Sequence, residues 1–356
     1  MVREPLPFLV AFGLSAVVVW VTTPLVRTIG LRLGIVDKPS SRKMHKEPVA
    51  RIGGVSIFLG TATALLFCWW AGWFGVLPTP KEYEIWGVTI GGLLFFAIGL
   101  ADDFLDLPAL SRLVGQLLVA GLAWWVGVRI EFITLPFVGL VQLGVLSFPV
   151  TVLWLAGIAN AVNWIDGLDG LAAGVSAIAA LILLITSLFM KQSGAGLIAA
   201  ALSGGCVAFL RYNFKPDRPA EIFMGDGGAY YLGFTLAGIS VIGVAKTVAT
   251  MAVVLPYLIL AVPLFDALTV ILTRLYRGQS PFVADKRHLH HRLVAAGVSK
   301  RHTVLFIYAL TLWVGSLALA ISGMTAGGTY AAIGTGIMVY AGWRTWQRIR
   351  RNNNAT

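Results

Sequence analysis

The chain has 356 residues, and its 27 Lys and Arg with 16 Asp and Glu make up 12% of it, about half the charged share of an ordinary soluble domain. Hydrophobic residues make up 58%, and the mean hydropathy is +0.83. No soluble globular class can bury so much apolar surface, so the composition predicts an integral membrane protein. The two cysteines, Cys68 and Cys206, lie in uncharged stretches and indicate neither a disulfide scaffold nor a metal cluster.

The membrane spans are predicted from the charge-free intervals, because a helix needs about 20 apolar residues to cross the hydrocarbon. The last interval can hold two spans, with a break at the glycine-rich run 323–328. The shortest is flanked by Arg112 and Arg129, whose long side chains can snorkel to opposite faces of the membrane. We therefore expect an all-α polytopic fold of about eleven transmembrane helices, in the intervals 5–26, 52–80, 85–101, 113–128, 132–165, 170–190, 192–210, 227–245, 247–265 and 302–343.

The distribution of Lys and Arg predicts the orientation of these spans. One set of loops, with the C-terminal tail, holds 22 of the 27 basic residues, and the other set holds 5. The N-terminus is therefore expected outside and the C-terminus in the cytoplasm. The net charge of +11 is explained by this topology and by attraction to anionic lipid heads, so no nucleic acid is needed as a partner. We expect one integral membrane domain over residues 1–356, with cytoplasmic loops at about 31–51, 101–112, 160–170, 211–228 and 274–302.

Acidic residues gather on the same side, where 12 of the 16 lie at or near the cytoplasmic face. Acids do not follow the positive-inside rule, so this asymmetry indicates cytoplasmic chemistry. The loop 37–51 comes first and is rich in phosphate-binding side chains. Any inner loop is basic, however, so a lipid-facing role is favoured when this loop is considered by itself. Asp102 and Asp103 follow at the end of the third span, where adjacent carboxylates favour a shared cation such as Mg²⁺ over a merely solvated helix end.

Two further clusters combine acids with glycines that let a ligand approach the backbone. Segment 160–170 holds two asparagines and two aspartates after an apolar helix, more than an Asx-turn and a helix N-cap would need. Segment 220–228 places Asp226 between glycines at a helix entrance, where it could equally be a metal ligand or an N-cap. A fourth cluster, 277–292, packs three histidines among Lys and Arg, which favours a diphosphate over a transition metal. Together the clusters predict metal-assisted phosphoryl transfer.

In these motifs the chain resembles the polyprenyl-phosphate N-acetylhexosamine-1-phosphate transferases, the group that contains MraY, WecA and TagO. The likeness runs from Asp37 to Arg292, and its motifs occur in the family's order. They are the pair Asp102-Asp103, the N-x-x-N-x-x-D-G-x-D-G segment 160–170, the F-M-G-D segment 223–226 and the histidine motif 288–291. The family's fold, a bundle of ten or eleven transmembrane helices with a cytoplasmic-side active site, agrees with the topology counted above.

Within the family, Asp106 and the histidine pattern 288–291 resemble the WecA/TagO branch. They differ from MraY, which carries Lys at the position of Asp106 and has three consecutive histidines. The resemblance implies UDP-N-acetylglucosamine as donor, undecaprenyl phosphate as acceptor and UMP as leaving group. It also implies Mg²⁺, with Mn²⁺ as a substitute, a bacterial inner membrane location and a homodimer. The run 213–220 is about three residues longer than is usual in the family, which weakens a nucleoside-contact role for Asn213.

The resemblance also implies roles for single residues. Asp226 would be the main metal ligand with Asp103 in support, and Asp102 would orient the acceptor phosphate or receive its proton. A phosphate monoester is largely ionised near neutral pH, with a second pKa of about 6, so a base would contribute little. By the same resemblance, the catalytic aspartates would be Asp102, Asp103, Asp166 and Asp169. Contacts to the sugar nucleotide and its phosphates would come from Lys46, Asn163, Asp166, Asp169, Asn213, Phe223, His288, His290 and His291.

Three alternatives stay open from the sequence. UDP-MurNAc-pentapeptide or another UDP-N-acetylhexosamine could be the donor. A transporter would also place acids among membrane helices, but nearer the middle of the membrane and often in two related halves. A CDP-alcohol phosphotransferase would share the start of the motif at Asp166, but its arginine position is Gly174 here, and no acid follows until Asp217.

Overall fold

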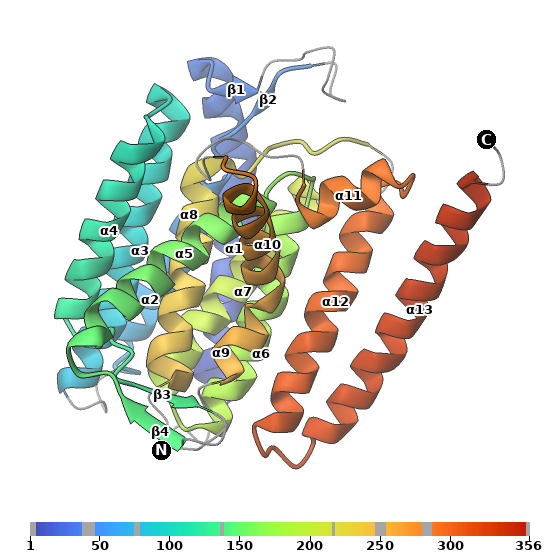
Figure 1. Cartoon of the computed structure of the whole chain (residues 1–356). Helices are drawn as coiled ribbons and strands as arrows, with labels where there is room; N and C mark the ends of the chain where they lie inside the picture. The colour runs from blue at the N-terminus through green and yellow to red at the C-terminus, as the bar shows by residue number, and fades with distance from the viewer. Residues whose placement is uncertain are drawn as a thin grey trace.

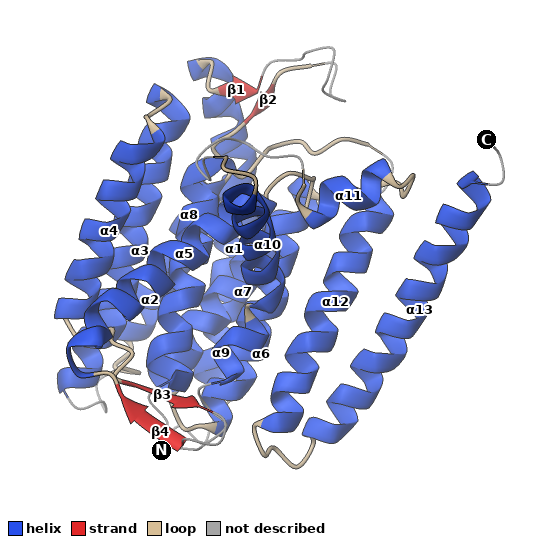
Figure 2. Cartoon of the chain, in the orientation of Figure 1, coloured by secondary structure: helices blue, strands red, loops and turns tan. Residues whose placement is uncertain are grey.

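The computed structural model describes residues 5–37, 47–74, 79–135, 139–215, 218–245, 254–279 and 287–353. Helices dominate these residues (Figure 2). The α-helices are α1 (Leu6–Leu33), α2 (Gly54–Trp70), α3 (Thr79–Leu105), α4 (Ala109–Trp125), α5 (Ser147–Ile165), α6 (Leu171–Phe189), α7 (Ser193–Asn213), α8 (Gly225–Ser240), α9 (Val254–Ile259), α10 (Ala261–Tyr276), α11 (Leu289–Ala295), α12 (Lys300–Ile321) and α13 (Gly327–Asn353). Two antiparallel pairs join β1 (Val36–Asp37) to β2 (Val49–Ala50) and β3 (Phe132–Leu135) to β4 (Gly139–Gln142), and two short turns are the 3₁₀ turn η1 (Gly144–Leu146) and the π-helical turn η2 (Val241–Ala245).

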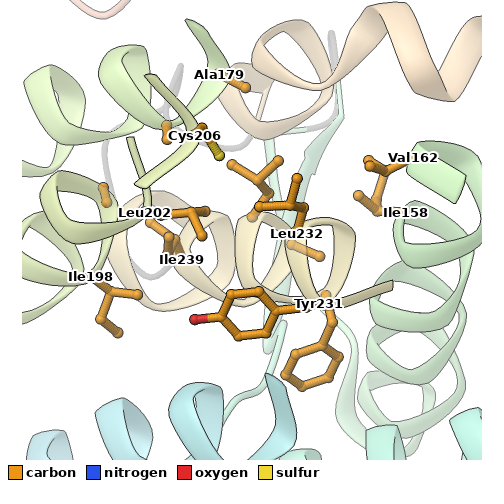
Figure 3. Packing of buried hydrophobic residues seen from close by; sticks show 14 of the residues in the cluster. Ile158, Val162, Ala179, Ile198, Leu202, Cys206, Tyr231, Leu232 and Ile239 are labelled. Carbon is orange, nitrogen blue, oxygen red and sulfur yellow. The ribbon is translucent and has the colours of Figure 1, made fainter. Parts of the chain in front are cut away.

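Helix α8 lies inside the bundle, and every residue from Gly227 to Ser240 is buried. Its small residues let neighbouring helices come close, since a Cβ on Gly233 would lie 2.5 Å from the Cα of Ala159 in α5. Figure 3 shows Leu232 and other α8 side chains gathered with residues of α5, α6 and α7 in one packed interior. The motif at the start of α8 is therefore anchored to a helix that is buried from Gly227 to its end.

The outer surface of the bundle is apolar, as a lipid-facing surface must be. Among the described residues, six helices are long and apolar enough to cross a membrane: α1, α3, η1 with α5, α6, α7 and α12. This confirms the predicted class, an all-α membrane protein with several spans. Helices α2 and α4 are apolar but shorter, at 17 residues each. The count of eleven crossings and the orientation of the termini stay predictions.

Two predicted spans differ from the structure in their extent. Interval 132–165 begins with the antiparallel pair β3–β4, and its α-helix α5 begins only at Ser147. Interval 247–265 was expected to end at the first charge, Asp266, but α10 continues through it to Tyr276. A buried partner for Asp266 makes that continuation possible, as shown below.

The chemical motifs lie at one end of the bundle. The α3–α4 connection, the β1–β2 pair, the start of α8 and helix α11 are all at the upper end in Figure 1, whereas the β3–β4 hairpin is at the lower end. Backbone hydrogen bonds join two of these segments, because Phe223 N–H donates to Ala50 O at 2.8 Å and Gly53 N–H donates to Phe223 O at 2.9 Å. Segments more than a hundred residues apart thus form one surface.

Candidate active site

Asp103 is the anchor of the site, at the last turn of α3. Its carboxylate accepts backbone N–H bonds from Asp226 and Gly227, both at 3.0 Å, and so caps the start of α8. It also accepts two bonds from the guanidinium of Arg51, at 3.2 Å from Nε and 3.0 Å from Nη2. These four donors occupy both oxygens of a buried side chain, so Asp103 links α3, α8 and the strand β2 region.

Glycines make this close approach possible. Gly225 has a φ of +77°, and a Cβ there would lie 2.1 Å from Arg51 O and 2.6 Å from Oδ2 of Asp103. On the α3 side, a Cβ at Gly99 would lie 2.5 Å from Asp226 O. Larger residues at these two positions would push α3 and α8 apart, and Asp103 could no longer reach the start of α8.

Asp102 faces a different cation from its neighbour. Its Oδ1 accepts the backbone N–H of Leu107 at 2.8 Å, which closes the turn between α3 and α4, and its Oδ2 pairs with the guanidinium of Arg112. Arg112 was expected to snorkel toward a membrane face, but its guanidinium pairs with Asp102 and lies 3.9 Å from Asp226. Arg129, the other arginine expected to snorkel, donates to Trp124 O at 2.8 Å and lies over that tryptophan's ring.

Asp226 is the central carboxylate. Its Oδ1 accepts a hydrogen bond from Asn163 at 2.7 Å, and its Oδ2 lies 4.0 Å from Nη2 of Arg51 and 3.9 Å from Nη1 of Arg112. Its carboxyl is also within hydrogen-bond reach of Asp102. The side chain is 30% exposed, against 1% for Asp103, so Asp226 is the acid of this group that a ligand can reach.

The end of α5 contributes amides to the same place. Asn163 binds Asp226, and Asn160 donates to Oε1 of Gln116 in α4 at 2.6 Å as well as to its own helix at Ala156 O. The two asparagines are spaced to share a helix face, and they link α5 to α4 and to α8. The amide pair thus holds three helices together around the acids.

The turn 166–170 carries two further aspartates and is fixed from three sides. Asp169 accepts the backbone N–H of Ala220 at 3.0 Å. Gly170, with a φ of +80°, donates its N–H to Oδ1 of Asn213 at 2.9 Å and accepts the hydroxyl of Tyr308 at 2.5 Å. Asn213 is itself buried and donates to Ile222 O at 2.9 Å. It therefore braces the turn, and direct contact with a nucleoside stays a prediction.

Asp166 lies within electrostatic range of the other acids of the site. Desolvation by the surrounding protein, followed by repulsion from Asp226, Asp103 and Asp169, raises its pKa to about 7. A carboxyl in this position titrates near neutral pH until a cation arrives. The arrangement therefore favours binding of a positive ion beside a polyanionic ligand.

The histidine motif covers this turn. His290, in α11, is 2% exposed, and its Nε2 lies so close to Gly167 that a Cβ there would be 2.3 Å away. Burial, followed by repulsion from the imidazoles of His291 and His288, lowers the pKa of His290 to about 4. The rings of His290 and His291 are 4.2 Å apart. Lys46, the other residue predicted to contact phosphate, lies outside the described residues, and stacking of Phe223 on uracil stays a prediction.

The donor set fits Mg²⁺ as a cation shared with a substrate. Within the described part of the chain, no three Asp, Glu, His or Cys side chains form a complete metal cage. Mg²⁺ is commonly held by one or two carboxylates together with substrate phosphates, which suits the accessible carboxylate of Asp226. Asp103, predicted as a second metal residue, supports Asp226 through the backbone, and a direct bond from Asp103 to the metal stays a prediction.

Arg51, Arg112 and Tyr308 are the contributors that the sequence motifs missed. Each is a single basic or aromatic residue without a spacing pattern, and the partners of Arg51 and Tyr308 lie far away in the chain. Arg51 follows a basic loop and Arg112 borders a span, so both had simpler explanations as membrane-face residues. The acids predicted from the motifs do lie close together, and the cations among them are Arg51 and Arg112.

Comparison with known proteins identifies the family. Residues 85–244 match the model of glycosyl transferase family 4. The chain is 37% identical over 306 residues to the probable undecaprenyl-phosphate N-acetylglucosaminyl 1-phosphate transferase of Bacillus subtilis, a match that covers 85% of this chain and 81% of that protein. It is 34% identical over 348 residues to the decaprenyl-phosphate N-acetylglucosaminephosphotransferase of Mycolicibacterium smegmatis, covering 88% and 81%.

A more distant relative is the undecaprenyl-phosphate alpha-N-acetylglucosaminyl 1-phosphate transferase of Salmonella typhi, which is 27% identical over 288 residues, covering 80% of this chain and 75% of that protein. The family match includes the Asp102-Asp103 pair, the turn 166–170 and Asp226. The chain therefore belongs to glycosyl transferase family 4, among the polyprenyl-phosphate N-acetylhexosamine-1-phosphate transferases.

Proposed function

We propose that this protein transfers N-acetylglucosamine-1-phosphate from UDP-N-acetylglucosamine to undecaprenyl phosphate. The reaction releases UMP and forms the lipid-linked diphosphate sugar that starts a cell-envelope glycan. Relatives that cover most of the chain carry N-acetylglucosaminyl 1-phosphate transferase activity in their names. The observation that carries the proposal is the convergence of Asp103, Asn163, Arg51 and Arg112 on one partly exposed carboxylate, Asp226.

Asp226 holds the metal ion, Mg²⁺ or Mn²⁺ in its place, which when bound supplies positive charge to the diphosphate of the donor. Asp103 fixes the backbone of Asp226, so the reachable carboxylate stays at one position. Arg51 and Arg112 lie 4.0 and 3.9 Å from the same oxygen and balance the acids before the substrate arrives. Positioning and charge neutralisation are the main requirements of phosphoryl transfer.

The acceptor phosphate oxyanion attacks the β-phosphorus of the donor, the bond to the UMP oxygen breaks, and UMP leaves with that electron pair. Both oxygens of Asp102 are engaged by Leu107 and Arg112, which favours an orienting role over that of a base. Proton removal contributes little in any case, since the acceptor monoester is largely ionised near neutral pH. Asp166, Asp169 and Asn163 hold the nucleotide, Lys46 neutralises the diphosphate, and the imidazoles of His288, His290 and His291 contact it.

The site faces the cytoplasm of a bacterial inner membrane, with the N-terminus outside and the C-terminus inside. The support is the basic-residue count, 22 against 5, together with the gathering of the motifs at one end of the bundle. The cytoplasm is also where a sugar nucleotide is available. A homodimer belongs to the same proposal, through the likeness to the family.

A donor panel tests the function. Purified protein is incubated with undecaprenyl phosphate, with or without Mg²⁺, and with UDP-N-acetylglucosamine or UDP-MurNAc-pentapeptide, and UMP and lipid product are followed. Magnesium-dependent turnover with the first donor supports the proposal. Turnover with only the second keeps the reaction and changes the donor. Failure of all donors, with uptake of labelled sugar nucleotide into sealed vesicles, would revive the transporter alternative.

A further inference from the structure

Helix α10 carries a buried acid that the proposed mechanism does not use. The side chain of Asp266 is 7% exposed. Its Oδ2 lies 2.8 Å from Nδ1 of His288, and its Oδ1 accepts the backbone N–H of Leu289 at 2.6 Å. One carboxylate therefore contacts both the side chain just before α11 and the first backbone donor of that helix.

The position of α11 matters because its histidines cover the acidic turn. The His288 and His290 rings stack nearly parallel, with centroids 5.8 Å apart and planes inclined by 9°. The His290 ring in turn lies against Gly167, and the His288 ring faces Trp164 at 6.3 Å. A shift of His288 would therefore be passed to the imidazole that contacts the turn.

We propose that Asp266 is a positioning residue that docks α11 onto the turn 166–170 and fixes the orientation of His288. An ionised carboxylate only accepts hydrogen bonds, so its partner Nδ1 must carry the proton, and Nε2 becomes the nitrogen that faces other groups. The partner carboxylate thus selects the imidazole tautomer, as such partners do for histidines that bind metals. The proposal rests on the proposed function, in which these histidines contact the donor diphosphate.

Asp266→Asn is the sharpest variant. Asn keeps an oxygen for the N–H of Leu289 but can turn an amide donor toward Nδ1 of His288, which favours the opposite tautomer. The matched control is Thr269→Val on the same helix, because that hydroxyl donates only within α10, to Phe265 O. We expect kcat to fall about tenfold, the worth of one charge-assisted hydrogen bond, with the donor KM changed little.

A double-mutant cycle separates positioning from general destabilisation. If Asp266 acts through His288, Asp266→Asn should cause no further loss of kcat in the His288→Ala background. Losses that multiply in the double variant would overturn the proposal, as would full activity of Asp266→Asn. A loss that only follows the fraction of folded protein would also overturn it, by reducing Asp266 to a stabilising residue.

Hydrogen exchange tests the docking without any turnover. Asp266→Ala, or Asp266→Asn if the Ala variant does not fold, should speed amide exchange in residues 287–298, while Thr269→Val should leave it unchanged. Unchanged exchange in both Asp266 variants would overturn the proposal. If the wild-type protein turns over no donor, the proposed function fails, but this measurement still decides whether Asp266 holds α11.

Discussion

Replacement of Asp103 by Asn should destabilise the protein by about 3 kcal/mol. Asn removes the charge and puts an NH₂ group where the carboxylate accepts N–H bonds from Arg51, Asp226 and Gly227. Loss of a helix N-cap costs about 1 kcal/mol, and loss of a charge-assisted bond costs about 1.5–3 kcal/mol. Because Arg51, Asp226 and Gly227 all donate to this one side chain, a single substitution removes these bonds at the same time and its costs add up.

The assay is unfolding of the purified protein in mixed detergent micelles, compared with Asp106→Asn. Asp106 lies three residues away, is exposed and has a φ of +47°, a backbone conformation that Asn also adopts. That control removes the same charge without touching the start of α8, so its free energy of unfolding should change by less than about 0.5 kcal/mol. An Asp103→Asn variant as stable as the wild type would refute the assignment of Asp103 as the anchor between α3 and α8.

Three other changes test the turn and its cover. Tyr308→Phe should cost about 1 kcal/mol and raise the donor KM, whereas Tyr212→Phe, whose hydroxyl donates to a carbonyl away from the site, should leave KM unchanged. Burial lowers the pKa of His290 to about 4, so the contribution of His290 to folding stability should fall by up to about 3 kcal/mol as the pH drops from about 6.5 to about 4. The raised pKa of Asp166 acts in the opposite direction over this range, so the His290 contribution is measured as the difference between the wild-type and His290→Gln pH dependences; identical pH dependences contradict the burial argument. Gly167→Ala should cost about 1–3 kcal/mol by displacing the imidazole, but Gly157→Ala, with open space around it, should not destabilise; equal stabilities would contradict the contact.

Composition predicts the membrane class correctly, and the motifs predict acids that the structure brings together, because both are local properties of the sequence. The low charge content gives the class, and glycines beside Asp166, Asp169 and Asp226 mark where the backbone comes close. The cations that pair with the acids are not predictable in this way. Arg51 meets Asp103 only when the β2 region packs against α3, and Arg112 meets Asp102 only when α4 folds back beside α3. A basic residue at the membrane face is expected in any case.

The sequence did offer a signal for Asp266 that the motifs obscured. An acid within an otherwise apolar helix indicates a partner or a function, and Asp266 is the one acid among residues 254–273. Because the predicted span ends before Asp266, the continuation of α10 to Tyr276 was not predicted. The β3–β4 hairpin was missed for a related reason, since a charge-free interval reports burial or lipid contact and does not distinguish strand from helix.

The most direct test of the central claim follows the β-phosphorus of the donor. UDP-N-acetylglucosamine labelled with ³²P at the β-position is incubated with undecaprenyl phosphate, Mg²⁺ and either the wild-type protein or Asp226→Asn. Transfer of the sugar with its phosphate predicts that the label moves into the lipid and that unlabelled UMP appears, with little label transferred by the variant. Label that stays in UDP while sugar reaches the lipid would show glycosyl transfer without phosphate, and full transfer by Asp226→Asn would remove that residue from the centre of the site.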